Sequence, residues 1–266
     1  MPTTNANGIE LYYDERGQGD PLLLIAGLGA SGELWAGQVP LLAREFRVIT
    51  FDNRGAGRSE KPPQPYSIAL FADDTAALMD ALGIETAFVY GQSMGGLIAQ
   101  EFGVRHARRA RALVLGCTTF GGPRSVWPSP EAASVLSSFA TAPSQAALEA
   151  ALKVFFSPRF LEGNRNEAAR WMNSYLERRP PEDAYMRQFA ACLAFDLYER
   201  LPQIQTPALV INGAEDELAP AENSRIMAER IPGAELVLFP ETGHFYFYEQ
   251  PEESARVVTE FLRRRG

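Results

Sequence analysis

Histidine and cysteine are scarce in this sequence, and it has no long apolar run. Its 266 residues include two histidines and two cysteines, too few to predict a metal site or a framework of disulfides. We expect Cys117 and Cys192 to be small buried side chains. No run approaches the roughly 18 apolar residues that span a bilayer, and no basic and then apolar leader stands at the N-terminus. We therefore expect a cytoplasmic protein with no metal ion and no membrane partner.

Basic residues are also few relative to acidic ones. The 25 lysines and arginines are outnumbered by 33 acidic residues, which gives a net charge of −8. Such a balance argues against nucleic acid or an anionic membrane as a partner. The apolar content of 46% and the charged content of 22% are ordinary for a globular protein, and a chain of this length can bury a large core. We expect its partner to be a small molecule.

The most informative motif is GQSMG at 91–95, which lies between the apolar run 87–90 and a segment of helical character, 94–102. A serine between two glycines at a strand-to-helix corner is typical of a nucleophile elbow. The tight turn strains the backbone at Ser93, so its neighbours must be small, and the helix N-terminus favours developing negative charge. The motif predicts that Ser93 is a nucleophile.

A serine hydroxyl needs a base, and the chain offers His106 and His244. His106 lies at the end of the helix that starts at the elbow, roughly 20 Å from Ser93 at 1.5 Å per residue. It most simply complements the dipole of that helix end. His244 follows the strand-like run 236–239, in the kind of loop where α/β proteins keep their chemistry. By elimination, His244 is predicted to be the base.

The base in turn needs a carboxylate to fix its tautomer and stabilise the imidazolium. The apolar run 208–213 ends in glycine and is followed by the sequence AEDE. Glu215, Asp216 and Glu217 are therefore the candidates. For the two glutamates, an acidic solvated loop is the competing interpretation.

The developing oxyanion needs two donors. One is the backbone N–H of Met94, which follows the nucleophile, and the other comes from the loop after an earlier strand. The apolar run 21–26 predicts that strand, and the amide of Leu28 in the following loop is the natural second donor. Glycines on both sides of Leu28 let the backbone come close to a substrate.

The same loop supports a rival interpretation. Gly27, Gly29 and Gly32 match G-x-G-x-x-G directly after a strand, and Asp52 lies 20 residues beyond Gly32. Taken alone, this spacing fits the dinucleotide-binding fingerprint, with Asp52 as the ribose ligand. A dinucleotide site would leave the elbow and His244 unexplained, whereas a serine hydrolase uses both and the glycine loop as well. We therefore expect no cofactor.

These motifs make the chain resemble an α/β-hydrolase of the compact, capped kind that includes carboxylesterases, 3-oxoadipate enol-lactonases and cofactor-free haloperoxidases. The resemblance covers essentially the whole length. It rests on segments 26–29, 52–59, 91–95, 213–220 and 243–251.

The resemblance implies that Asp216 is the third catalytic residue, in the chain order Ser93, Asp216, His244. Asp216 lies three residues past Gly213, which fits the family pattern. One departure concerns Ala26, because relatives often have a histidine there. That residue usually supports the oxyanion loop, so its absence puts the rigidity of the loop in doubt more than the activity.

The α/β-hydrolase resemblance implies a mostly parallel eight-stranded sheet flanked by helices, with a helical cap inserted late in the sheet. Alternating strand and helix signals agree with a parallel sheet covered on both faces. An antiparallel hairpin is predicted at 3–15, followed by strands at 22–26, 47–51, 86–90, 111–116, 208–213 and 235–240. Helices are predicted at 33–44, 70–82, 94–105, 222–231 and 251–264.

The alternation breaks between Gly116 and Pro207. We expect residues 1–118 and 202–266 to form the core, and residues 119–201 to form a helical cap folded over Ser93. Within the cap, segments 143–156 and 167–178 have helical periodicity. The residues predicted to contact substrate are Gly27, Trp35, Phe120, Trp127, Phe139 and Phe245, although helical aromatics mostly pack in cores.

The expected reaction is hydrolysis of a carboxylic ester or lactone through a serine ester. A cofactor-free haloperoxidase or perhydrolase, a carbon–carbon bond hydrolase and a non-catalytic small-molecule receptor remain alternatives on this fold. Epoxide hydrolases and haloalkane dehalogenases need an aspartate nucleophile, so Ser93 argues against both.

Overall fold

The apolar runs of the sequence form the strands of one sheet. The computed structural model describes residues 2–141 and 144–266. Its strands are β1 (Thr3–Ala6), β2 (Ile9–Arg16), β3 (Asp20–Ile25), β4 (Phe46–Phe51), β5 (Ala87–Gln92), β6 (Ala110–Gly116), β7 (Ala208–Gly213) and β8 (Glu235–Phe239). Each predicted strand lies within a residue or two of its observed bounds.

The strand order is β1-β2-β4-β3-β5-β6-β7-β8. β2 pairs antiparallel with β1 and with β4, and every other pairing is parallel. The prediction of a mostly parallel, eight-stranded sheet is therefore confirmed. In the central pairing, Ile25 of β3 lies opposite Gly91 of β5. The loop after β3 thus begins beside the elbow that follows β5.

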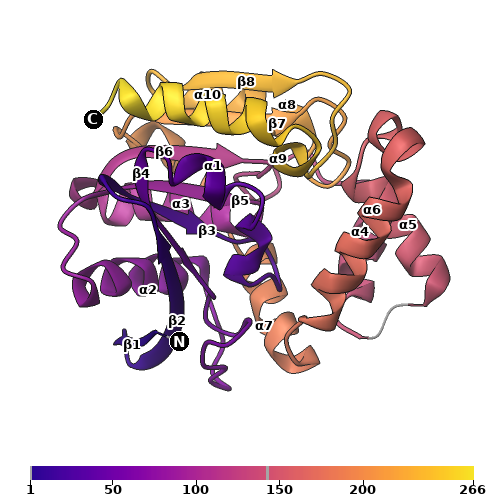
Figure 1. Ribbon diagram of the computed structural model, residues 1–266, viewed down its shortest axis with the longest axis horizontal. Helices are drawn as coiled ribbons and strands as arrows, with labels where there is room; N and C mark the ends of the chain where they lie inside the picture. The colour runs from indigo at the N-terminus through magenta and orange to yellow at the C-terminus, as the bar shows by residue number, and fades with distance from the viewer. Residues whose placement is uncertain (1, 142–143) are drawn as a thin grey trace.

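The sheet is covered on both faces because successive strand residues point to opposite sides. Leu22 and Leu24 of β3 pack into one hydrophobic cluster, which includes Val258 and Phe261 from the C-terminal helix. Leu23 and Ile25 pack into the other, which is filled by the helices that follow β4 and β5. Helices therefore cover both faces of the sheet (Figure 1).

The core helices follow the strands. They are η1 (Gly32–Trp35), α1 (Val39–Leu42), α2 (Ile68–Ala81), α3 (Met94–Arg105), η2 (Ala107–Arg109), α8 (Ala221–Arg230), α9 (Tyr246–Glu249) and α10 (Pro251–Arg263). Four of the predicted helices match α2, α3, α8 and α10 closely.

The continuous helix predicted over 33–44 is wrong. The structure has the short 3-10 turn η1 and then the single turn α1. Gly37 lies between them and favours non-helical backbone. Pro40 lies in the first turn of α1, where its missing N–H costs no hydrogen bond, whereas in the middle of a longer helix it would break the ladder.

The segment between β6 and β7 is mostly helical, as predicted. It contains α4 (Pro130–Ser138), α5 (Gln145–Phe155), α6 (Pro158–Glu177), α7 (Glu182–Leu193) and η3 (Tyr198–Gln203). The hydroxyls of Ser129, Ser144 and Ser157 cap α4, α5 and α6, each accepting a backbone N–H three residues on. Pro143, where one helical segment was predicted to begin, lies outside the described residues.

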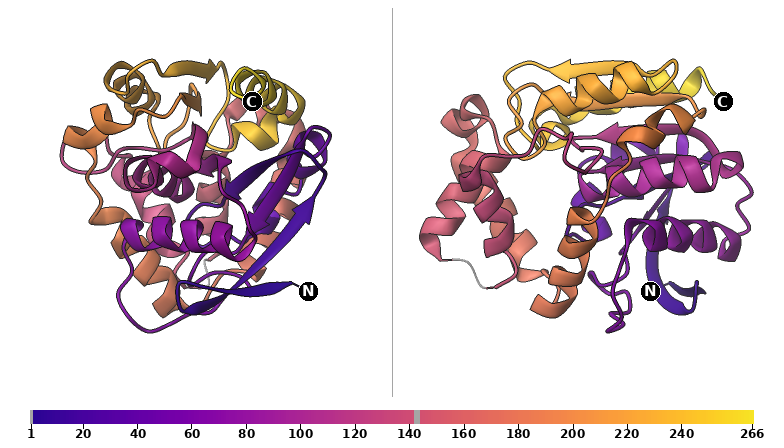
Figure 2. Two further views of the ribbon diagram at one scale, coloured as in Figure 1. Left: turned by 90° about the vertical axis from the view of Figure 1, so that its left-hand side faces the viewer. Right: turned by 180° about the vertical axis from the view of Figure 1, so that it is seen from behind.

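Figure 1 shows α4, α5 and α6 grouped at one end of the sheet, and the opposite view in Figure 2 agrees. α7 lies between this group and the core. The division into a core at 1–118 and 202–266 and a cap at 119–201 stays a prediction. Among the described helices, none is both long enough and apolar enough to cross a membrane.

Candidate active site

Ser93 occupies a strained corner between β5 and α3. Its φ of 56° and ψ of −118° lie in a region that side-chain-bearing residues rarely adopt. Two hydrogen bonds from the end of the sheet hold it there. The Ser93 N–H donates to the Gly116 carbonyl at 2.9 Å, and the Thr118 hydroxyl donates to the Ser93 carbonyl at 2.8 Å. The corner therefore has the backbone strain that the motif predicts.

The flanking glycines are required by close backbone contacts. A Cβ on Gly91 would lie 1.9 Å from the Gly95 carbonyl oxygen, and a Cβ on Gly95 would lie 2.1 Å from the Ile25 carbonyl oxygen. A side chain at Gly91 would therefore push the start of α3 away from β5, and a side chain at Gly95 would push it away from the end of β3.

His244 is held by the carboxylate of Asp216. The Nδ1 atom of His244 lies 2.8 Å from Oδ2 of Asp216, and both side chains are buried. The Oδ1 atom of Asp216 accepts the backbone N–H groups of Leu218 at 2.8 Å and Ala219 at 2.9 Å. Because a carboxylate accepts hydrogen bonds, Nδ1 is the ring nitrogen that donates to Asp216, and Nε2 is left as the accepting nitrogen.

The two other acids of the same loop lie elsewhere. Glu215 and Glu217 are exposed, whereas Asp216 is buried. Of the three candidates left open by the sequence, the structure brings only Asp216 to His244 among the described residues.

Gln92, the residue before Ser93, is a neighbour of His244 that the sequence analysis does not predict. Its side-chain Nε2 lies 3.2 Å from Nε2 of His244, and Gln92 is buried. Ser93, Gln92 and His244 all line one cavity. The only signal in the sequence was the position of Gln92 beside Ser93, which does not by itself say where its side chain points.

The two amides predicted to bind an oxyanion donate to no other group of the described residues. Leu28 lies in the loop after β3 and Met94 is the first residue of α3, and both line the cavity with Ser93. Within the described part of the chain, neither N–H donates to another protein group. A helix leaves its first N–H groups without intrahelical partners, so Met94 is well placed to donate to an anion.

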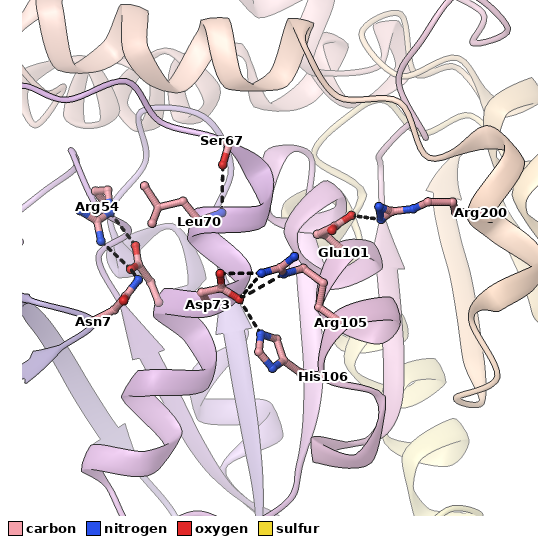
Figure 3. A network of polar contacts seen from close by, with 10 residues as sticks. Asn7, Arg54, Ser67, Leu70, Asp73, Glu101, Arg105, His106 and Arg200 are labelled. Carbon is pink, nitrogen blue, oxygen red and sulfur yellow. Dashed lines mark hydrogen bonds and ion pairs between the residues drawn. The ribbon is translucent and has the colours of Figure 1, made fainter.

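His106 lies away from this cavity. It ends α3, and its Nε2 lies 2.8 Å from Oδ1 of Asp73 on α2 (Figure 3). Burial acts to raise the pKa of Asp73, but hydrogen bonds from Arg105 and His106 outweigh it and the pKa is lowered. The predicted place of His106 at the helix end is confirmed, and its pairing with Asp73 was not foreseen.

The structure argues against the dinucleotide site that the glycine spacing and Asp52 suggested. Asp52 is buried and holds the glycine loop, since Oδ1 accepts the Gly32 N–H at 2.7 Å and Oδ2 accepts the Arg58 N–H at 2.7 Å. The glycine loop leads into the four-residue turn η1, not into the α-helix whose N-terminus would bind a pyrophosphate.

Glu249 joins the loop of His244 to the inserted helices. Its Oε1 accepts the N–H groups of Ser157 and Gly243, each at 3.0 Å, and its Oε2 accepts the Ser157 hydroxyl at 2.6 Å. Burial raises the pKa of Glu249, and these hydrogen bonds oppose the rise. The carboxylate therefore ties the start of α6 to the residue before His244.

The cavity above Ser93 has a volume of about 170 Å³. No charged side chain lines it within residues 2–141 and 144–266, and its polar wall comes from Gln92, Ser93, Thr118, Thr119, Tyr175 and His244. The apolar wall is formed by Leu28, Ala30, Leu34, Met94, Leu97, Trp127, Pro128, Ala133, Leu136, Phe155, Phe189, Leu193, Leu218, Ala219 and Phe245. The surroundings of Ser93 thus suit a neutral, largely apolar molecule.

Three of the six predicted substrate contacts line this cavity. They are Gly27, Trp127 and Phe245, and Trp127 is 47% exposed. The other three are packed in the hydrophobic clusters. Trp35 lies against Tyr90 and Phe247, Phe120 against Tyr198, and Phe139 against Phe155. A large aromatic side chain can fill a core as well as line a pocket, and in the described part of the chain these three fill the core.

The two cysteines are unpaired and both line the cavity. Cys117 is buried as expected, whereas Cys192 is only partly buried. Burial raises the pKa of the Cys117 thiol well above its usual value and raises the pKa of Cys192 to about 12. Both therefore remain neutral thiols.

Comparison with known proteins agrees with this architecture. The sequence pattern of the family described as "alpha/beta hydrolase fold" matches residues 20–251. The chain belongs to the α/β-hydrolase family. Among α/β hydrolases, a relative from Caulobacter sp. (strain K31) named "Putative carbamate hydrolase RutD" is 33% identical over 261 residues, which is 95% of each chain.

Two solved α/β-hydrolase structures are similar over nearly their whole length. The enol-lactonase from Burkholderia xenovorans LB400 is 32% identical with a TM-score of 0.86, covering 98% of this chain and 100% of that one. A thermophilic esterase from Thermogutta terrifontis is 30% identical with a TM-score of 0.84, covering 99% and 97%. The likeness confirms the predicted fold and the family to which the sequence was assigned.

Proposed function

We propose that this α/β hydrolase cleaves carboxylic esters or lactones through an acyl-enzyme on Ser93. The observation that carries the proposal is the fixed His244–Asp216 pair beside Ser93 in a single apolar cavity. The Nε2 atom of His244 takes the proton of Ser93 as its oxygen attacks the carbonyl carbon. His244 then protonates the departing alkoxide and activates the water that hydrolyses the acyl-enzyme.

The amides of Leu28 and Met94 are proposed to hold the oxyanion. One such donor is typically worth about 2.7–4 kcal/mol in the transition state. The donors are backbone groups of a loop and of a helix N-terminus, so they are in place before the charge develops. This preorganisation is the reason that they lower the barrier.

The cavity favours a neutral substrate with an apolar acyl group. With no charged side chain in its described wall, an ionised substrate would lose its hydration without gaining a partner. The similarity to an enol-lactonase and to an esterase supports ester or lactone chemistry.

Hydrolysis of a neutral carbamate ester is the second candidate. The relative named as a carbamate hydrolase, at 33% identity, favours it, and the carbonyl of a carbamate would meet the same serine and donors. The wall of the cavity argues against a free carbamate anion for the same reason as for any other ion.

The test compares nitrophenyl esters of rising chain length, nitrophenyl carbamates and lactones as substrates. Ser93→Ala should lower turnover of the best substrate by about 10⁴–10⁶-fold, and a fluorophosphonate probe should label Ser93. His106→Ala is the matched control and should keep its activity. Substantial hydrolysis by the Ser93→Ala protein would contradict the mechanism, and a preference for carbamates would select the second candidate.

A further inference from the structure

Two side chains from the inserted helices hold the same peptide group of the oxyanion loop. The hydroxyl of Tyr175, on α6, donates to the carbonyl of Leu28 at 2.6 Å. The N–H of Gly29 donates to Oε1 of Gln188, on α7, at 2.8 Å. The carbonyl and the N–H between Leu28 and Gly29 are thus both bound by residues more than a hundred positions further along the chain.

The donor and acceptor roles of both side chains are set by their surroundings. Gln188 is fully buried, and its Nε2 donates to the Arg54 carbonyl at 2.7 Å, so its Oε1 must face Gly29. Burial raises the pKa of Tyr175 far above the physiological range, so the phenol keeps the proton that it donates. Tyr175 can therefore only donate to the Leu28 carbonyl, and Gln188 can only accept from the Gly29 N–H.

The peptide that they hold lies at the centre of a tight turn. The Ala30 N–H donates to the Gly27 carbonyl at 3.2 Å, and Gly29 has a φ of +68°. A positive φ at the third residue is the mark of a type II turn. Types I and II differ mainly by a flip of the central peptide, which here is the Leu28–Gly29 peptide.

The core gives this turn little side-chain support. Ala26, at the start of the loop, has only a methyl group, although its carbonyl accepts the side-chain amide of Asn53 at 3.0 Å. Within the turn itself, residues 27–30, the side chains that bind the backbone come from the inserted helices, whereas the core residue Asp52 binds the loop only further on, at Gly32. A Cβ on Gly29 would lie 2.8 Å from the Tyr185 ring, so the turn is pressed directly against them.

We propose that Tyr175 and Gln188 are positioning residues that lock the central peptide of this turn. They thereby hold the backbone of Leu28, whose own N–H belongs to the preceding peptide, in the position from which that N–H faces the oxyanion. The inserted helices then have a second role besides covering the substrate. Their side chains hold the loop of the core that carries the Leu28 N–H. The inference rests on the proposed role of the Leu28 amide. Its effect should fall on the transition state and leave ground-state binding almost unchanged.

Tyr175→Phe is the direct test, with Tyr185→Phe as the matched control. The hydroxyl of Tyr185 donates to the carbonyl of Leu136 in α4 at 2.7 Å, so the control also removes one hydroxyl bound to a backbone carbonyl. Tyr175→Phe should lower kcat for the best ester by about 10- to 100-fold, with KM within about twofold. It should weaken inhibition by a trifluoromethyl ketone, a tetrahedral analogue, by a similar factor. Tyr185→Phe should change neither.

Gln188→Met supplies a second, independent variant. Because Tyr175 and Gln188 hold one peptide, the double variant should be little worse than the poorer single variant, which is the sign of coupled residues. Additive losses in kcat, or equal losses in Tyr175→Phe and Tyr185→Phe, would overturn the proposal.

Amide hydrogen exchange at Gly29, followed by NMR, separates this inference from the proposed function. Exchange should accelerate in Tyr175→Phe and in Gln188→Met, and stay unchanged in Tyr185→Phe, whether or not any ester is a substrate. Faster exchange in a protein without esterase activity would reject the function and keep the locked turn. Unchanged exchange and unchanged kcat in a protein that needs Ser93 would reject the locked turn alone.

Discussion

The side-chain nitrogen of Gln92 lies 3.2 Å from Nε2 of His244, the atom proposed to take the proton of Ser93. On its other side the Gln92 amide faces Gly27, where an added Cβ would lie 2.6 Å from Oε1 of Gln92 and 3.2 Å from Cβ of Ser93. The absence of a side chain at Gly27 therefore leaves room for Gln92 and Ser93 to stay beside the base.

Gly27→Ala should lower kcat/KM by at least about tenfold, because small displacements of reacting groups can cost up to about 10²-fold. Its methyl group would push Gln92 toward His244. Gly37→Ala is the matched control, since an added Cβ there meets no atom within 4 Å. Ester hydrolysis by the two purified variants provides the measurement, and equal activities would remove Gly27 from the site.

Asp216→Asn should lower kcat by about 10⁴-fold, because the amide would favour the wrong tautomer of His244. His244→Ala should be nearly as damaging as the loss of Ser93. The exposed neighbours give matched controls, so Glu215→Gln and Glu217→Gln should keep activity within about twofold, since neither removes a contact of His244. A larger loss from either glutamine variant than from Asp216→Asn would mean that the wrong acid has been assigned.

Trp127→Ala and Phe139→Ala should separate selectivity from stability. Trp127 lines the cavity and is half exposed, so its loss should shift the preferred acyl-chain length, at about 1–3 kcal/mol per methylene, with little effect on unfolding. Phe139 is buried against Phe155, so its loss should lower the free energy of unfolding by about 3–5 kcal/mol. Ester panels and urea denaturation measure the two effects, and the reverse pattern would contradict the assignments.

Glu249→Gln should change how stability depends on pH. Burial raises the pKa of Glu249 above its ordinary value of 4.5, so the folded protein binds this proton more tightly than the unfolded chain. The contribution of Glu249 to stability is therefore present below the ordinary pKa and is lost as pH rises through the folded pKa. A glutamine can still accept both N–H groups and donate to Ser157, without the charge.

The free energy of unfolding of Glu249→Gln, relative to the wild type, should consequently rise as pH increases from about 4.5. Urea denaturation of both proteins at several pH values measures this difference. Glu252→Gln is a suitable control, because Glu252 is exposed on α10. A difference between Glu249→Gln and the wild type that falls with pH would reverse the sign argued here.

The strands and the elbow could be predicted because each depends on local sequence. A buried parallel strand such as β5 reads as a continuous apolar run, and the strain at Ser93 demands the flanking glycines within the same few residues. The prediction of one helix over 33–44 was wrong because it gave too little weight to Gly37 and Pro40, two residues that interrupt helices.

The rest of the site depends on contacts between distant segments. No pattern in the sequence tells that Phe139 fills a core while Phe155 lines the cavity, because both are aromatic residues of helical segments. Likewise nothing near Tyr175 or Gln188 in the chain shows that each meets the Leu28–Gly29 peptide. Glu249 lies in segment 243–251, on which the family resemblance partly rests. Its three hydrogen bonds could not be predicted, because they depend on where Ser157 and Gly243 lie in the folded chain.

The strand order sets the sequence in which the site is completed on the ribosome. β3, β5 and β6 are neighbours in the sheet, so the part of the chain that emerges first already contains the elbow and the oxyanion loop. Asp216 and His244 follow β7 and β8, which join the sheet edge last. Because synthesis favours folding of N-terminal segments first, a growing chain carries Ser93 before Asp216 and His244 are made. Under the proposed mechanism, hydrolysis therefore has to wait until the last strands have joined the sheet.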